Sequence, residues 1–173
     1  MRRIVAGIDL GGTAINYTLL DAHSREFLVP GLAEQPARAQ EGADVCLGEI
    51  AAGLTRIAGA YGVDPQSILA VGLDTPGPAS AAGVLSARGS TNFAHPSWRG
   101  FDLRGGLEER LKRPVTYLND GNAAALWGHM ALFGSAPESP HRESARGPPR
   151  RRIRCVPRPR VHRRRGRRQG RCR

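Results

Sequence analysis

The chain has 173 residues, which is enough for one domain with a hydrophobic core and too few for two full lobes. Its formal net charge of +11 would be typical of a protein that binds nucleic acid or an anionic membrane, so the position of that charge along the chain matters. Three widely spaced cysteines exclude a disulfide framework, and the apolar run Ile4–Ile8 is too short for a secretory or membrane-spanning segment, so we expect a cytoplasmic protein outside the membrane.

The first part of the chain predicts a hairpin, one more strand and a long helix. Ile4–Ile8 and Ile15–Leu20 are rich in β-branched and apolar residues, and the glycines between them mark a turn. A third strand is expected at Glu26–Val29. From Gln40 to Tyr61 apolar residues recur at steps of three and four, which predicts an amphipathic helix that packs on the sheet. The residues that set this spacing are Leu47, Ile50, Leu54, Ile57 and Tyr61.

Strands and helices alternate in the next part of the chain. Ile68–Leu73 is continuously apolar, as expected of a central strand that is buried on both faces. A helix follows at Leu103–Leu111, with Asp102 as its N-cap and Pro114 closing it. Val115–Leu118 is then predicted to be a short strand.

The last predicted helix covers Asn122–Phe133, and both Trp98 and Trp127 are expected to anchor the core. The resulting order is three strands, a helix, a strand, a helix, a strand and a helix. It indicates an α/β fold, with a mixed sheet and flanking helices. That order fits the N-terminal lobe of the actin-like ATPase, or ribonuclease H-like, fold, which we assign to residues 1–134.

Residues 135–173 have a different composition. They hold 15 Lys and Arg against 2 Asp and Glu, whereas residues 1–134 hold 11 against 13, so all of the basic excess lies in this tail. The tail has no hydrophobic periodicity and cannot bury enough apolar surface to offset its ordering entropy, about 1–2 kcal/mol per residue. We therefore expect a disordered Arg/Pro-rich tail, and its abrupt arginine bias suggests translation in a shifted reading frame.

A candidate phosphate-binding turn, Asp9-Leu10-Gly11-Gly12-Thr13, lies between the first two strands. Two glycines permit positive φ and let backbone N–H groups close on an anion, Thr13 adds a hydroxyl, and the Asp9 carboxylate can hold a metal through water. An ordinary Gly-Gly hairpin explains the same pentapeptide equally well.

Two loops are candidates for ligand contacts. Gly72–Pro78 follows the central strand, where ligand sites of α/β sheets gather, although a plain Pro-Gly turn explains it when it is taken alone. Gly89–Phe93 is rich in hydroxyl and amide groups that hydrogen-bond to sugars, but most such loops bind nothing.

A candidate catalytic base follows the last strand, in Asn119-Asp120-Gly121-Asn122. A carboxylate held at a strand end can accept a proton from a substrate hydroxyl, which is what phosphoryl transfer requires of its base, and Asp120 is the candidate. The alternative is that Asp120 is only the N-cap of the helix, within ordinary turn chemistry.

In this order and spacing the motifs resemble the ROK family, which includes glucokinases, fructokinases and N-acetylhexosamine kinases, and the resemblance covers residues 4–134. It implies ATP- and Mg²⁺-dependent phosphorylation of a hydroxyl on a hexose or N-acetylhexosamine. The residues implied at the ATP phosphates are Asp9, Gly11, Gly12 and Thr13, with Asp9 holding Mg²⁺ through water. Those implied at the sugar are Gly77, Thr91, Asn92, Asn119 and Asp120, with Asp120 also acting as the catalytic base.

The sequence departs from the family pattern in several places. Ala14 stands where many relatives carry lysine, and Asp74 stands where they usually have glycine. After Gly134 nothing resembles the family's second phosphate motif, its Glu-x-Gly-His sugar motif, its cysteine-rich structural zinc site or its adenosine pocket. Family members are often homodimers, and the regulators among them carry a DNA-binding helix-turn-helix first, which a first strand at Ile4 disfavours.

Two hypotheses of different classes follow. The first is a hexokinase or glucokinase of the ROK type that lacks its second lobe and is inactive alone, because the nucleotide cleft excludes water only when two lobes close on it. The second is a non-catalytic protein that binds nucleic acid through its basic tail, by electrostatic contacts that do not depend on sequence.

Overall fold

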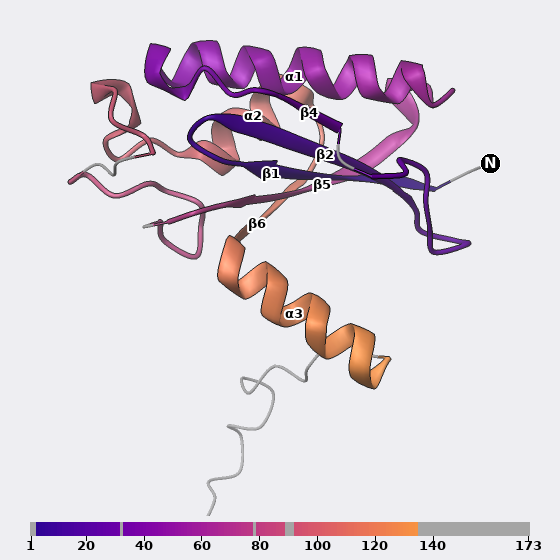
Figure 1. Ribbon diagram of the computed structural model, residues 1–173. Helices are drawn as coiled ribbons and strands as arrows, with labels where there is room; N and C mark the ends of the chain where they lie inside the picture. The colour runs from indigo at the N-terminus through magenta and orange to yellow at the C-terminus, as the bar shows by residue number, and fades with distance from the viewer. Residues whose placement is uncertain (1–2, 32, 78, 89–91, 135–173) are drawn as a thin grey trace, which may run out of the picture. The chain divides into compact units, whose positions relative to one another are not determined.

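The computed structural model describes residues 3–31, 33–77, 79–88 and 92–134. The tail and Thr91 therefore lie outside the described residues. Within these ranges the chain forms a six-stranded sheet with helices on its faces, as the sequence predicted (Figure 1).

The predicted hairpin forms the antiparallel part of the sheet. β1 (Ile4–Leu10) pairs with β2 (Ala14–Asp21) from Ile4 opposite Asp21 to Leu10 opposite Ile15. The outer edge of β2 carries two short strands, β3 (Glu26–Phe27) and β4 (Ala33–Pro36). β3 is shorter than predicted, and β4 was not predicted, because four residues ending in proline carry little strand signal. Proline is tolerated there because β4 lies at an edge.

The parallel part of the sheet brings three strand ends to one edge. β5 (Ile68–Thr75) pairs parallel with β1 on one side and with β6 (Val115–Asn119) on the other. The strand order is β3-β2-β1-β5-β6, so the sheet is mixed. Since β1, β5 and β6 run in the same direction, their C-terminal ends meet at the same edge of the sheet.

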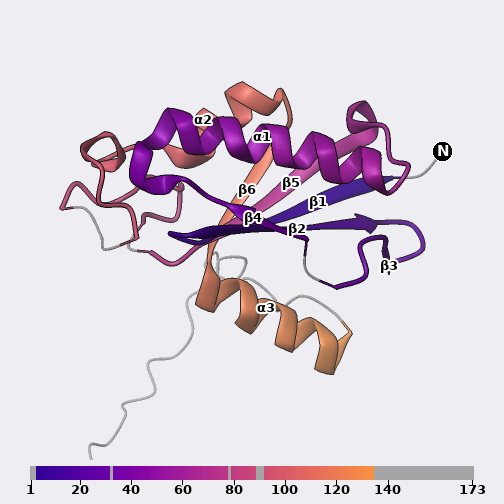
Figure 2. The same cartoon turned by 45° about the horizontal axis from the view of Figure 1, so that its top comes forward.

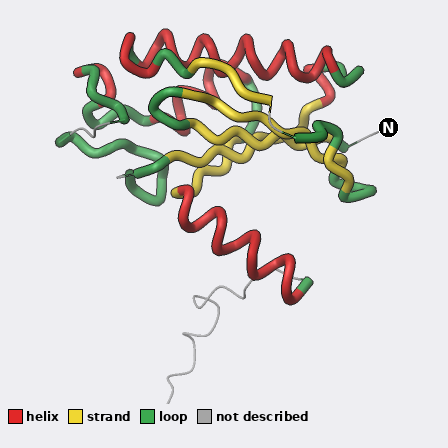
Figure 3. The backbone as a smooth tube through the Cα atoms, in the orientation of Figure 1, coloured by secondary structure: helices red, strands yellow, loops and turns green. Residues whose placement is uncertain are grey.

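The helices cover the two faces of the sheet unequally. α1 (Ala43–Ala60) and α2 (Leu103–Leu111) lie over one face, and α3 (Asp120–Phe133) lies on the other side, as both views show (Figures 1 and 2). Three short 3-10 turns, η1 (Ala39–Glu41), η2 (Pro65–Ser67) and η3 (Pro96–Trp98), lie in the connections that Figure 3 draws around the strands. No helix among the described residues is long and apolar enough to cross a membrane.

The helix positions confirm most of the sequence prediction. Leu47, Ile50 and Leu54 of α1 are buried against the sheet, as their spacing predicted, whereas Tyr61, the last residue of the predicted stripe, follows the helix and is exposed. Asp102 is the N-cap of α2, since its side chain accepts a hydrogen bond from Gly105 N at 2.8 Å.

Two expectations about the core are wrong. β5 was expected to be buried on both faces, but Leu69 is 47% exposed, because α3 covers the second face only in part. Trp98 is fully buried as expected, whereas Trp127 is 57% exposed. Instead of anchoring the core, Trp127 packs edge-to-face on Phe27, with ring centroids 5.9 Å apart.

Candidate functional site

Polar side chains from three strand ends gather at one edge of the sheet. Asp9 of β1 is the register partner of Asp74 in β5, and Thr75 of β5 is the partner of Asn119 at the end of β6. Asp120 follows directly and begins α3. The predicted metal-binding carboxylate and the predicted base therefore lie at the edge where ligands of such sheets bind.

The Gly-Gly turn is a tight hairpin. The N–H of Gly11 donates to the carbonyl of Ala14 at 2.9 Å, so this amide is used inside the hairpin rather than being free for a phosphate. Neither Gly11 nor Gly12 is among the described glycines with positive φ. A positive φ, which the sequence suggested as the reason for glycine, is therefore not what requires glycine at these two positions.

The reason for glycine at position 12 is close contact with Asn92. A Cβ added to Gly12 would lie 2.9 Å from Asn92 Cβ and 3.0 Å from Asn92 Cα, which is closer than side-chain carbons approach. The predicted phosphate turn and the predicted sugar loop, 80 positions apart in the sequence, thus touch directly. Thr91, the other predicted contact in that loop, lies outside the described residues.

Gly77 and Asn119 form a second pair of predicted sugar residues that the fold brings together. A Cβ on Gly77 would lie 3.1 Å from Asn119 Nδ2. That amide nitrogen donates to the carbonyl of Thr75 at 3.3 Å, and Asn119 Oδ1 accepts from Gly121 N at 3.2 Å. The side chain of Asn119 is thus fixed by the two elements that it joins.

Asp120 is not the helix cap. Asn119 is the N-cap of α3, and Asp120 is the first residue of the helix, with an exposed side chain that accepts from Gly121 N at 2.6 Å. An anionic group is favoured at this position because the N-terminal end of a helix carries partial positive charge. N-capping of α3, the structural alternative to catalysis that the sequence offered for Asp120, therefore belongs largely to Asn119. The Asp120 carboxylate faces solvent.

Asp74 joins this group of carboxylates, although the sequence reading treated it only as a departure from the family pattern. Burial, and then the neighbouring charges of Asp9 and Asp120, raise the pKa of Asp74 to about 6. A signal for it was present, since Gly7-Ile8-Asp9 and Gly72-Leu73-Asp74 repeat the same spacing. The two repeats lie side by side in register.

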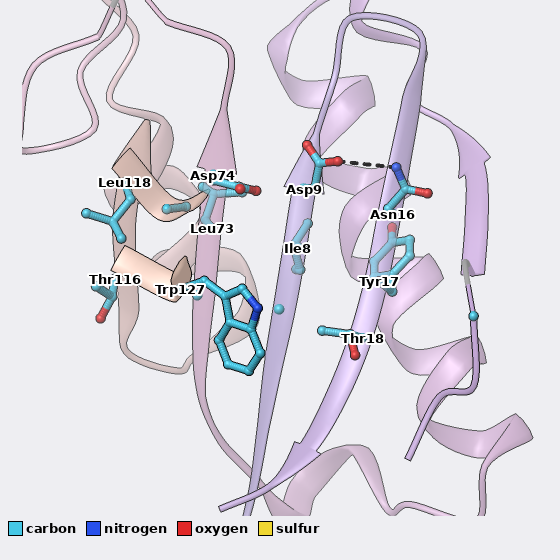
Figure 4. Close-up of a pocket in the computed structure, with 14 residues that line it drawn as sticks. Ile8, Asp9, Asn16, Tyr17, Thr18, Leu73, Asp74, Thr116, Leu118 and Trp127 are labelled. Carbon is cyan, nitrogen blue, oxygen red and sulfur yellow. Dashed lines mark hydrogen bonds between the residues drawn. The ribbon is translucent and has the colours of Figure 1, made fainter. Parts of the chain in front are cut away.

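The surroundings of Asp9 fit a hydrated metal ion. Asn16 Nδ2 donates to Asp9 Oδ2 at 3.3 Å, as the dashed line in Figure 4 shows. The Oδ1 atom of Asn16 is buried and has no hydrogen-bond partner among the described residues, so a ligand that reached it would supply the hydrogen bond that it lacks. No group of three or more His, Cys, Asp or Glu in the described ranges could hold a metal ion. Mg²⁺ here would thus depend on water and phosphate oxygens, which it commonly retains.

A cavity of about 520 Å³ lies between α3 and the less covered face of the sheet. Gly7, Gly72 and Trp127 line it, and Asp9 and Asp74 lie side by side at one end of it (Figure 4). Of the sequence-predicted site residues that the structure describes, Asp9 alone lines this cavity. The sugar and phosphate residues meet at the sheet edge instead.

The comparisons with known proteins identify the family and the fold. A model of the ROK family matches residues 5–134. A glucokinase from Halalkalibacterium halodurans is 29% identical over 128 residues, which cover 72% of this chain and 36% of that protein. The crystal structure of a ROK hexokinase from Thermus thermophilus matches with a TM-score of 0.59 and 34% identity, over 73% of this chain and 38% of that one.

A third similar structure is that of a ROK family glucokinase from Streptomyces griseus in complex with glucose and AMPPNP. It matches with a TM-score of 0.58 and 24% identity, over 76% of this chain and 38% of that chain. At this identity the match supports the fold, which is that of ROK sugar kinases with their actin-like ATPase lobe.

Proposed function

Because the chain belongs to the ROK family, we propose that its described residues form the part of an ATP-dependent sugar kinase that holds the sugar hydroxyl, the phosphates and the catalytic base. The chain spans little more than a third of the length of the relatives it matches, 36% of the glucokinase and 38% of the hexokinase. Phosphoryl transfer is therefore proposed for this site when it is joined to the remaining part of a ROK sugar kinase fold.

The observation that carries the proposal is the contact between Gly12 and Asn92. A phosphoryl transfer needs the donor phosphate and the acceptor hydroxyl in adjoining positions, because positioning supplies most of the catalysis. The turn that resembles a phosphate site and the loop that resembles a sugar site adjoin in this fold.

On the sugar side, the proposed contacts are the amides of Asn92 and Asn119, and Gly77 and Thr91 are proposed as further contacts. Asn119 is held by Thr75 and Gly121, so its amide is oriented before a sugar arrives. Asp120 is the proposed base that accepts the proton of the attacking hydroxyl. Its exposed carboxylate at the start of α3 leaves room for that hydroxyl.

On the phosphate side, Gly11, Gly12 and Thr13 are proposed to face the ATP phosphates. Asp9, with Asn16 beside it, would hold the water shell of Mg²⁺, whose chemistry is to neutralise charge on the phosphate oxygens. Asp74 adds a third carboxylate near this end of the site. Its raised pKa of about 6 means that this carboxylate becomes neutral at a higher pH than an ordinary Asp, although most of it is ionised at pH 7.

Glucose and ATP are the first candidate substrates. One matched relative is a glucokinase, and one matched structure holds glucose and AMPPNP. The test is a chimera in which residues 5–134 replace the matching part of the Thermus thermophilus ROK hexokinase. ATP-dependent glucose phosphorylation by the chimera is expected. A folded chimera that phosphorylates no hexose or N-acetylhexosamine would contradict the proposal.

The 173-residue chain itself is expected to bind glucose weakly and to show no turnover, because one lobe cannot close a cleft around the nucleotide. Turnover by the chain without any further polypeptide would contradict this expectation.

The second candidate function rests on composition. We propose that residues 135–173 form a segment distinct from residues 1–134, and that any nucleic-acid binding is carried by its 15 basic residues. Such binding is expected to weaken steeply with salt and to be equal for unrelated DNA sequences. Titrations of the full chain with two DNA duplexes of unrelated sequence, at about 50 mM and about 200 mM salt, test this proposal. Salt-insensitive or sequence-selective binding would exclude it.

A further inference from the structure

One short stretch of chain contacts both the phosphate turn and the sugar loop. We define residues 37–40 as the bridging segment. At its start, the N–H of Ala37 donates to the carbonyl of Thr13 at 2.9 Å. At its end, Gln40 Nε2 donates to the carbonyl of Asn92 at 3.5 Å, and the carbonyl of Ala39 accepts from Trp98 Nε1 at 2.7 Å. The segment thus connects the two halves of the proposed site.

The backbone of the bridging segment is held in an uncommon conformation. Arg38 has φ of 51° and ψ of 28°, the left-handed region that a residue with a long side chain rarely adopts. Its guanidinium binds both carboxylate oxygens of Glu41, at 2.7 and 2.6 Å, and reaches Glu49 of α1 at 2.8 Å. Strain of this kind persists where the surroundings fix the residue, and it is common at functional sites.

The other end of the contact is equally restrained. Phe93, next to Asn92, is 2% exposed and packs on Trp98, with ring centroids 4.9 Å apart. Trp98 in turn packs edge-to-face on Phe101 at 5.7 Å. Asn92 therefore lies between an aromatic anchor, the side chain of Gln40 and the backbone of Gly12, and a shift of the turn would be transmitted to it.

We propose that Gln40 is a positioning residue for Asn92, and that the bridging segment makes the affinities for phosphate and sugar depend on each other. This rests on the proposed function of the two contacted sites. An anion that orders the Gly12–Thr13 turn also fixes Ala37 and, through the segment, the carbonyl of Asn92. The sugar then meets an amide that is already ordered, and it loses less conformational entropy on binding.

The ligand-free test is an NMR comparison of the full chain and its variants. The backbone ¹⁵N shift of Phe93 reports the hydrogen bond at the preceding carbonyl, that of Asn92. Gln40→Glu removes the donor with almost no change of shape, whereas Gln40→Lys restores one. Gln40 is exposed, so both variants are expected to fold. A shift of the Phe93 resonance in the Glu variant that the Lys variant reverses is expected. An unchanged Phe93 resonance in the Glu variant would overturn the positioning role.

The coupling is tested with glucose as the sugar and Mg²⁺-pyrophosphate as the phosphate probe. In the unmodified chain, saturating pyrophosphate is expected to tighten glucose binding about fivefold, the lower end of usual coupling factors. This factor should fall to about one in Gln40→Glu. It should persist in Gln40→Lys and in the control Gln66→Ala, an exposed glutamine that contacts Arg113 instead. A factor that survives in Gln40→Glu would show that the coupling runs through the direct contact of Gly12 with Asn92, and would overturn the role of the bridging segment.

Failure of the proposed function looks different from failure of this inference. If the unmodified chain binds no sugar and no pyrophosphate, the two sites are misassigned, and the coupling proposed between them is overturned as well. If both ligands bind independently, the sites stand and the coupling is wrong. The Phe93 resonance decides the positioning role in either case, because it needs no ligand.

Discussion

The two faces of the sheet are built from the same strands, yet they differ in what they carry. Tyr17 and Leu19 of β2 face α1 and are buried, and the Tyr17 hydroxyl donates to backbone carbonyls of that helix at 3.3 Å. Asn16 and Thr18 alternate with them and face the cavity beside α3. The same alternation places Asp9 and Asp74 on the second face. Strand alternation thus separates the residues that stabilise the fold from those that carry charge.

The largest expected effect concerns the sheet edge at which the proposed site residues gather. Asp120→Asn in the hexokinase chimera should lower kcat by about 10² to 10⁴, because the proton of the sugar hydroxyl loses its acceptor. The measurement is ATP-dependent glucose phosphorylation at saturating substrates. Full activity in the Asn variant would show that Asp120 only favours the helix start.

Substitution of the two tryptophans compares how much each face of the sheet contributes to stability. Trp98→Ala should lower the free energy of unfolding by about 3–5 kcal/mol, because it empties a fully buried site. Trp127→Ala should change it by less than about 1 kcal/mol, since this side chain is mostly exposed. Urea unfolding of both variants gives the two values. Equal losses would mean that the second face contributes as much core as the first.

Asp74 should make stability depend on pH. Its pKa of about 6 in the folded protein, against an ordinary 3.8, means that the folded state binds the proton more tightly. The stabilising contribution of the protonated form is therefore lost as pH rises through about 4 to 6. At pH 7 Asp74→Asn should be more stable than the unmodified protein by about 1–2 kcal/mol, a value discounted for solvent screening.

The same variant gives the control for that prediction. Near pH 4 the two proteins should unfold at almost the same urea concentration, because Asp74 is then protonated in the folded state. A stability difference that does not change with pH would show that the Asn substitution acts through packing rather than charge.

A further prediction compares the two glycines of the turn. Gly12→Ala should cost about 1–3 kcal/mol of stability, because its Cβ would overlap Asn92 and force the loop to move. Gly11→Ala is the matched control, since its Cβ would lie 3.2 Å from the carbonyl oxygen of Ala14 and touch no part of the sugar loop. NMR should show shifted Asn92 resonances in the first variant alone. Equal shifts in both variants would mean that the Asn92 resonances report a change in the hairpin rather than a change in the contact between Gly12 and Asn92.

Much of this arrangement could be predicted from local sequence. The apolar spacing of α1, the capping Asp102 of α2 and the glycine-interrupted hairpin are signals that lie within one element each. The exposure of Trp127 and of Leu69 in β5 could not be predicted, because an apolar residue looks the same in the sequence whether or not another element covers it. Whether another element covers an apolar residue depends on the whole fold.

The sequence by itself determined the order of strands and helices apart from β4, the turn at Gly11-Gly12 and the candidate role of Asp120, because propensity, periodicity and motif spacing act over a few residues. Only the tertiary structure decided that Gly12 touches Asn92, that Asp74 lies in register with Asp9, and that Asn119 rather than Asp120 caps α3. Each of these depends on which distant segments meet, and strand register and packing distances set that.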